Sequence, residues 1–308
     1  MMRSLGFVQR SLGLLIITAC TSAAPPDDIV PEVVGRLEDA KIREASGLAR
    51  SQLRPDVLWI INDNGAKEIV HAIDHTGARL GEFDLKKSKN KDWEDLASFR
   101  LNDKPYLMIA DIGDNDAKRA HRSLYFVEEP APTPNGEEKR DWRVRYVYPD
   151  GPRDAEAAAV DTESQQALVL SKRDLPPRLY AVPLHPANDE TLTATFVGTV
   201  NSLQKPSRQE VEFAAKNKSW HWQPVGMDIS EDNLAAVILT YHAVYYYQRQ
   251  PGQDWLETLN TKPARIGLGN FKNAESVAFG DTERSVFVTG EKKHSRLLRI
   301  DLNRVPAP

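Results

Sequence analysis

Blocks of apolar and polar residues follow one another in a pattern that returns five times after residue 40. Each unit opens with a short apolar segment that usually has an acidic residue near its start. A second apolar segment ending in polar residues follows, and then a third. The openings are Glu44–Ala49, Asp92–Ala97, Asp154–Ala159, Pro224–Ile229 and Ala274–Phe279. Self-similar strand units indicate radial repetition, so the pattern predicts an all-β chain folded as a β-propeller.

The first unit shows the predicted strands of one blade most clearly. Asn64-Gly65 and Thr76-Gly77 separate its segments and supply the positive φ that tight hairpins require. The second segment is an unbroken apolar run, typical of a strand that is buried on both faces. We therefore expect four strands in this blade, at Ser46–Arg50, Val57–Ile61, Ile69–Ile73 and Arg79–Leu85.

The last unit ends after its third strand and lacks an outer one. An apolar segment near the start, Ile29–Gly35, belongs to no unit. Pairing this segment with the last unit closes the ring and removes two free edges. We predict five blades in a single domain, 29–308, aligned at Ser46, Glu94, Glu156, Val225 and Glu275. A sixth blade hidden in one of the long inserts is the alternative.

The first 20 residues have the pattern of a targeting signal. Arg3 and Arg10 precede the short apolar run Leu12–Ile17, which fits the core of a signal peptide and is too short to span a bilayer. The run leads into Ile17–Cys20, which resembles the lipobox of bacterial lipoproteins. We expect a signal peptide at 1–19, a lipid on Cys20 and a tether over 20–28. The alternatives are an ordinary secretory signal cut nearby and an uncleaved anchor.

Cys20 is the chain's one cysteine, so disulfides cannot stabilise the domain. Thr21 stands where inner-membrane lipoproteins of enteric bacteria carry Asp. By that resemblance we expect an extracytoplasmic protein held at a membrane by its lipid, the outer membrane if the cell has one. The formal net charge of −4 excludes sequence-independent nucleic-acid binding, which needs clustered Lys and Arg. We expect a monomer whose partner is a small ligand or an envelope protein.

The candidate functional side chains are expected at one end of the blades. The first two strands of a blade run antiparallel, so the start of the first and the end of the second lie on one face near the axis. Crowded carboxylates there must be protonated, solvated or matched by a cation, and calcium accepts several oxygen ligands in loose geometry. The metal candidates are Glu44, Glu94, Asp95, Asp111, Asp114, Glu156 and Glu275; the ligand-binding candidates are Asn62, Asp63, Lys172, Tyr241 and Glu291.

Structural roles remain open for each of these residues. An acid at a strand start can accept hydrogen bonds from backbone amides of the next blade, and Asn64-Gly65 and Asp114-Asn115 are ordinary turn residues. Asp111–Asp116 is not an EF-hand, because its glycine is misplaced. The seven histidines show no zinc spacing. Trp220–Trp222 is either an aromatic platform for a planar ligand or part of the packing of an insert.

Several motifs together resemble a group of secreted bacterial propeller proteins that are grouped loosely with NHL, SMP-30-like and phytase-like propellers. The motifs are Glu44–Ala49, Trp59 with Asn62–Gly65, Asp92–Asp95, Asp111–Asn115, Tyr148–Gly151 and Gly226–Ser230. The resemblance spans nearly the whole mature chain. It implies the propeller fold and an extracytoplasmic setting, and it implies no reaction.

Three functions follow from these observations. The first is a lipid-anchored propeller that binds a ligand or a protein partner at an acidic, calcium-loaded axial face. The second is a metal-dependent hydrolase of the lactonase or phosphoesterase type, with Glu94 or Glu156 as the catalytic base. The third is an envelope scaffold whose rim loops dock partners without a small ligand.

Overall fold

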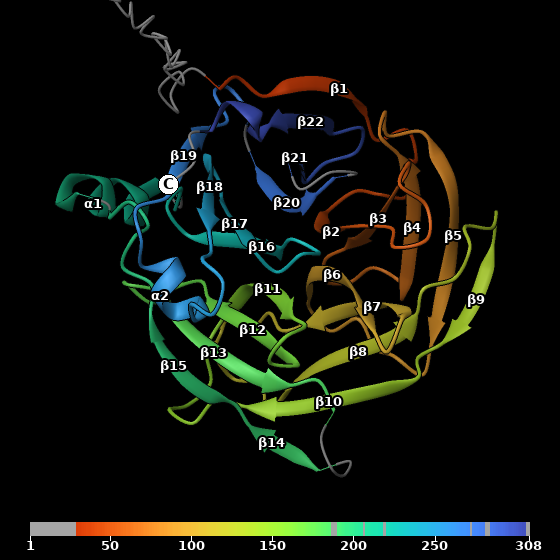
Figure 1. The fold of residues 1–308 in the computed structure, drawn as a ribbon, viewed down its shortest axis with the longest axis horizontal. Coiled ribbons are helices and arrows are strands. Elements are labelled where there is room, and N and C mark those ends of the chain that lie inside the picture. Colours follow the sequence, from red (N-terminus) through yellow and green to blue (C-terminus); the bar gives the residue numbers. More distant parts are fainter. Residues whose placement is uncertain are drawn as a thin grey trace, which may run out of the picture.

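The computed structural model describes residues 29–185, 190–205, 207–217, 220–271, 273–280 and 284–305. Five β-sheets stand around a central axis, each with its first strand innermost (Figure 1). The predicted five-bladed propeller is therefore confirmed. The predictions for residues 1–28, including Cys20, lie outside the described residues. Within the described ranges, no helix combines the length and the apolar character that crossing a bilayer requires.

The four antiparallel strands of each blade follow one another outward from the axis. Blade 1 holds β2 (Ala45–Arg50), β3 (Val57–Asn62), β4 (Ile69–Asp74) and β5 (Arg79–Lys86). Blade 2 holds β6 (Trp93–Leu101), β7 (Lys104–Asp111), β8 (Arg122–Glu128) and β10 (Trp142–Val147). Blade 3 holds β11 (Ala155–Asp161), β12 (Gln166–Ser171), β13 (Arg178–Pro183) and β15 (Thr195–Thr199). Blade 4 holds β16 (Pro224–Ile229), β17 (Ala235–Thr240), β18 (Ala243–Gln248) and β19 (Ala264–Gly267).

Blade 5 is built from both ends of the chain. It holds β20 (Ala274–Phe279), β21 (Ser285–Gly290) and β22 (Arg296–Asp301), and a short 3-10 helix, Leu302–Arg304, follows. The outer strand is β1 (Glu32–Arg36), which pairs antiparallel with β22. The predicted closure by an N-terminal strand is confirmed. It gives β22 a hydrogen-bonding partner and joins the two ends of the ring.

The long inserts do not form a sixth blade in the described part of the chain. The Pro-rich insert of blade 2 leads into β9 (Gly136–Lys139), which pairs parallel with β5 of blade 1. In the same way β14 (Thr191–Thr193), from blade 3, pairs parallel with β10 of blade 2. The remaining inserts carry α1 (Arg208–Asn217) and α2 (Trp255–Leu259), and α2 lies against β15. Segments of one blade therefore cover the outer edge of the preceding blade.

The hydrophobic core consists of five clusters, one between each pair of neighbouring blades. One cluster joins Trp59 of blade 1 to Leu107 of blade 2, and another joins Phe287 of blade 5 to Leu48 of blade 1. Every sheet is thus buried on both faces, which is why β3 and β17 are continuous apolar runs rather than alternating ones.

The first strand of every blade contains a β-bulge near its start. The pairing shifts between Ala45 and Gly47 in β2, and the equivalent shift occurs in the other four innermost strands. The bulged residues are Ser46, Glu94, Glu156, Val225 and Glu275, which are the five positions aligned in the sequence. A bulge leaves its extra residue unpaired and re-aims the side chain.

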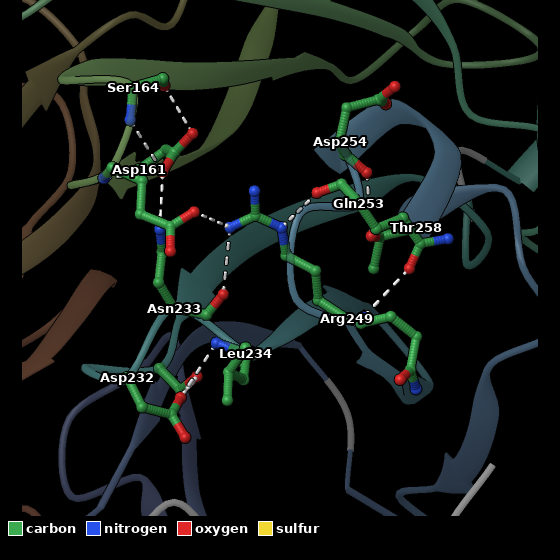
Figure 2. Close-up of polar contacts among 12 residues, drawn as sticks. Asp161, Ser164, Asp232, Asn233, Leu234, Arg249, Gln253, Asp254 and Thr258 are labelled. Atoms are coloured by element: carbon green, nitrogen blue, oxygen red, sulfur yellow. Dashed lines mark hydrogen bonds and ion pairs between the residues drawn. The ribbon is translucent and has the colours of Figure 1, made fainter.

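A polar network fastens blades 3 and 4 at the opposite ends of the innermost strands (Figure 2). Asn233, in the turn between β16 and β17, donates from Nδ2 to Asp161 Oδ1 at 2.7 Å. The Arg249 guanidinium donates to the Asn233 carbonyl at 3.2 Å and to the Gln253 carbonyl at 2.6 Å. These hydrogen bonds join blades 3 and 4 at the face opposite to the one that carries the bulged residues.

Candidate functional site

Three of the five bulged residues are glutamates, and the structure brings them together at the axis. Glu94, Glu156 and Glu275 are 4%, 6% and 8% exposed, so each retains a small solvent-accessible area. Their carboxylates lie close enough to raise one another's pKa, Glu94 with Glu156 and Glu156 with Glu275. The remaining two blades contribute Ser46 and Val225 at the same position. The bulge therefore concentrates the charge on blades 2, 3 and 5.

A second ring of side chains comes from the residue that follows the second strand of each blade. Asp63, Lys172 and Glu291 occupy this place, and the backbone N–H of each donates to a carbonyl just before the first strand of its own blade, at 2.8, 3.0 and 3.2 Å. Tyr241 follows β17 in the same way, whereas blade 2 has the buried Ile112. Both sets of residues therefore lie at the same end of the blades, near the axis.

The closest group of oxygens is formed by Asp63, Asp92 and Glu94. One carboxylate oxygen of each lies within 4.8 Å of the others. Asp92 precedes β6, and Gly113, after β7, lies against it. A Cβ on Gly113 would stand 2.2 Å from Glu94 Oε1 and 2.5 Å from Asp92 Oδ2. Only glycine at this position leaves both carboxylates where they are.

The other half of this site is organised by Lys172. Its ammonium is ion-paired with Glu156 and lies 5.4 Å from the ring centre of Tyr241. Burial opposes the charged ammonium, but Glu156 and Tyr241 outweigh it, and the pKa of Lys172 is raised. Burial, followed by the charge of Glu156, raises the pKa of Tyr241. Lys172 and Tyr241 therefore remain protonated at neutral pH.

These groups form an axial cluster in which negative charge is in excess. Its carboxylates are Asp63, Asp92, Glu94, Glu156, Glu275 and Glu291, and its cation is Lys172. Burial first, and the neighbouring carboxylates second, raise the pKa of Asp92 to about 7 and that of Glu275 to about 9. Burial also raises the pKa of Glu156 to about 7, although Lys172 opposes this. Without another cation the cluster must bind protons.

Comparisons with known proteins supply a general likeness of fold. No protein-family model and no curated protein matches the chain. One similar solved structure is a luciferin-regenerating enzyme, with a TM-score of 0.42 and 8% identity, covering 88% of this chain and 95% of that one. Another is a gluconolactonase from Xanthomonas campestris, with a TM-score of 0.44 and 10% identity, covering 90% and 96%. Likeness at this level carries no conclusion about activity.

Asp95 lies outside the axial cluster although it is adjacent to Glu94. Its Oδ1 accepts from the N–H of Leu96 at 2.9 Å, and its Oδ2 accepts from the N–H groups of Ala158 and Met227 at 2.8 and 3.0 Å. The bulge turns these two neighbours in different directions. The carboxylate of Asp95 therefore links blades 2, 3 and 4 through backbone amides.

Asp111 and Asp114 have cationic partners of their own. Asp111 pairs with Arg119 at 2.8 Å and accepts the Asp92 N–H at 2.9 Å. Asp114 pairs with the buried Arg122 and accepts the N–H groups of Lys118 and Arg119. These bonds fix the loop that carries Gly113, so both aspartates support the site from outside the group of converging oxygens.

Asn62 and Glu44 lie at the margin of the cluster. The amide oxygen of Asn62 accepts the N–H groups of Arg43 and Glu44 at 2.9 and 3.2 Å. Glu44 is exposed, and its charge contributes to raising the pKa of Asp63, after burial and Glu291. The candidates that the structure brings together are thus Asp63, Glu94, Glu156, Lys172, Tyr241, Glu275 and Glu291.

Two residues at the axial cluster, Asp92 and Gly113, are not among the candidates predicted from the sequence. Asp92 stands two residues before the bulged Glu94, as Glu44 and Asp154 stand two residues before the bulged positions of blades 1 and 3. That alignment would have identified it. Gly113 carries no functional group, and its close approach to two carboxylates is visible only in three dimensions.

A second group of acids lies on the outer part of blade 1. His71 Nδ1 stands 3.4 Å from Glu82 Oε2 and 3.7 Å from Asp39 Oδ2. Lys41 pairs with Glu82 at 2.6 Å, and Arg79 pairs with Asp39 at 3.1 Å. We call these five residues the outer cluster. Its two carboxylates are matched by two fixed cations.

The histidine of the outer cluster turns Nδ1 toward the acids and Nε2 toward Asn62. The N–H groups of Arg43 and Glu44 both donate to Asn62 Oδ1. The amide nitrogen of Asn62 therefore faces His71 Nε2, at 3.4 Å. Nε2 then accepts, and Nδ1 carries the proton. Burial lowers the pKa of His71, which keeps the ring neutral. The two carboxylates of the outer cluster are therefore matched by Lys41 and Arg79 and not by a histidine charge.

Proposed function

We propose that the axial cluster binds a divalent cation, calcium, and that the domain uses this ion to hold a ligand or a protein partner. The observation that carries the proposal is the group formed by Asp63, Asp92 and Glu94, whose oxygens converge within 4.8 Å. A cation there would replace the protons that the raised pKa values of Asp92 and Glu94 otherwise require.

The donor set fits calcium better than zinc. All candidate ligand atoms of the cluster are carboxylate oxygens on strand ends and loops, and calcium takes six to eight oxygen ligands in flexible geometry. Zinc favours four ligands that include imidazole or thiolate, and the cluster contains neither. Glu156 and Glu275 extend the oxygen-rich surface to neighbouring blades, next to Lys172.

The proposed setting is the extracytoplasmic side of a membrane, with the propeller tethered through a lipid on Cys20. Support comes from the order of positive residues, apolar run and cysteine in residues 1–20. Expressing the full chain as wild type and as Cys20→Ser tests this. The wild type is expected to be in the membrane fraction and to incorporate labelled palmitate. The variant is expected to leave the membrane fraction and to incorporate no palmitate. A variant that stays membrane-bound contradicts lipid anchoring.

Calorimetric titration of residues 29–308 with calcium tests the cation site directly. We expect saturable heat at one site per domain and a melting temperature that rises with calcium concentration, because binding to the folded state stabilises it. Magnesium serves as the control, since it demands a smaller octahedral site and dehydrates reluctantly. Absence of both heat and stabilisation with calcium would refute the proposal.

A second candidate function is metal-dependent hydrolysis of lactones or phosphoesters. The observation favouring it is that Lys172, Glu156 and Tyr241 lie together beside the converging carboxylates. These three side chains would therefore lie near a bound cation. A cation would polarise the scissile group and acidify water, and Glu156 would accept a proton. Turnover of a lactone and phosphoester panel that Glu156→Gln reduces at least about hundredfold supports this role; turnover indifferent to that change excludes it.

A further inference from the structure

A pocket of about 530 Å³ opens beside the axial cluster, across the end of blade 1. Its walls are the segment that precedes β2, with Lys41 and Arg43, and the loop between β3 and β4, with Lys67. The same loop carries Asp63 of the axial cluster. Glu44 and Asn62 line the inner end of the pocket. The pocket and the proposed cation site therefore share one loop and one face of the propeller.

The charges of the pocket are unevenly matched. Lys41 is paired with Glu82 at 2.6 Å. Arg43 and Lys67, by contrast, form no ion pair with any carboxylate in the described ranges of the chain. Among the described residues, the pocket thus presents two exposed cationic side chains and one exposed carboxylate, Glu44, without ion pairs, and its buried lining includes Glu82 and His71.

The lining also indicates a polar ligand. Asn64 offers an exposed amide group, and Ile69 is the largest apolar side chain. Ligand pockets of this size bury most of a small organic molecule and fix its orientation through a few polar groups. A planar carboxylate matches the donor fork of an arginine and the ammonium of a lysine.

We infer that this pocket binds a small organic anion, a carboxylate whose charge is received by Arg43 and Lys67. This ligand is the one that the axial face holds, and the inference rests on the proposed function for the cation in the neighbouring axial cluster. The ligand extends from the two cations toward Asn62, and calcium held by the adjacent Asp63 would add positive charge near that end of the pocket.

The test uses succinate and its neutral analogue succinamide as probes of the same shape. Titrations of residues 29–308 are run with and without saturating calcium. We expect succinate to bind at least about tenfold more tightly than succinamide, and calcium to strengthen the binding of succinate further. The double variant Arg43→Gln/Lys67→Gln is expected to lose that preference, while Lys262→Gln, an exposed lysine outside the pocket, retains it.

A steric variant keeps the test independent of charge. Ala66 lines the pocket, and Ala66→Trp is expected to weaken succinate at least about tenfold while leaving the calcium titration unchanged. Equal binding of succinate by the wild type and by both pocket variants overturns the inference, and binding of calcium in the same samples then leaves the cation site standing. If succinate binding depends on Arg43 and Lys67 but calcium does not bind, the pocket stands and the proposed function fails.

Discussion

The axial and outer clusters are both acid-rich, but only one contains its own counter-charges. In the outer cluster Lys41 and Arg79 reach the carboxylates of Glu82 and Asp39 at 2.6 and 3.1 Å. In the axial cluster Lys172 is the one cation among six carboxylates and is already paired with Glu156. Carboxylates that converge without fixed partners call for protons or an external cation.

The difference has a consequence for recognising binding sites. Nearness of acids identifies both clusters equally, since each brings three candidate ligand atoms within 4.8 Å. What separates them is the balance of charge around those atoms. Asp111 and Asp114, with Arg119 and Arg122, follow the outer pattern and act as supports.

The largest effect is expected from removing two axial charges together. Asp92→Asn/Glu94→Gln preserves shape but deletes the charge of two converging carboxylates. Calcium affinity is expected to fall more than about hundredfold in calorimetry. The matched variant Glu82→Gln in the outer cluster is expected to leave calcium affinity unchanged; a loss there instead would move the site to blade 1.

Gly113 provides a sharper test, because its substitution alters no charge. In Gly113→Ala the new methyl group would stand 2.2 Å from Glu94 Oε1, so the carboxylates must shift. We expect a loss of about 1–3 kcal/mol in the free energy of unfolding, typical of overpacking, and weaker calcium binding. Gly267→Ala is the control, since its nearest neighbour would be 3.9 Å away. Unchanged calcium affinity in Gly113→Ala would show that these oxygens do not bind the ion.

Much of the fold could be predicted because its determinants are local. Strands buried on both faces are apolar runs, and the repeated start of each unit aligns the five bulged residues. The unpaired segment near the N-terminus predicted the closure by β1. The parallel strand β9 could not be found in this way. Its sequence, Gly136–Lys139, is polar, and it becomes a strand because the edge of β5 is free to pair with it.

The sequence predicts where acidic side chains gather, but not which of them join the axial cluster. Glu94 and Asp95 are neighbours with equal chemistry, and the bulge alone sends one to the axial cluster and the other to backbone amides. The partners of Asp111 and Asp114 lie eight residues downstream, in Arg119 and Arg122. Spacing and sign of charge could have assigned those two aspartates to ion pairs.

The two clusters are also expected to respond to pH in opposite directions. Asp92, Glu156 and Glu275 have raised pKa values, about 7, 7 and 9, so the folded state binds more protons than the unfolded state between about pH 4 and those values. The calcium-free domain is therefore expected to lose stability as pH rises from about 5 to about 9. Glu82 has a lowered pKa: its burial is outweighed by Lys41 and other cations. Its contribution is present above its ordinary pKa and is lost as pH falls.

Melting temperatures measured across this range, with and without calcium, check both signs. Glu275→Gln is expected to reduce the alkaline loss, and saturating calcium is expected to reduce it further by replacing the protons. Glu82→Gln is expected to lower stability near pH 7 and to have little effect near pH 3. Alkaline stability that rises in the calcium-free protein would contradict the excess of negative charge at the axis.

The smallest effect is expected from Arg79→Gln, which makes the outer cluster resemble the axial one. The Arg79 side chain is 32% exposed, so solvent screens its pairs and the loss in the free energy of unfolding should be about 1 kcal/mol in urea denaturation. Lys118→Gln, which breaks a fully solvated pair with Asp116, is the control and should cost less. In the Asp92→Asn/Glu94→Gln background, millimolar calcium is expected to stabilise the protein only after Arg79 has been replaced, because Asp39 then lacks its fixed cation while Lys41 still pairs with Glu82. If calcium stabilises that background equally with Arg79 present, a matched counter-charge does not exclude an ion, and charge balance fails as the property that distinguishes the two clusters.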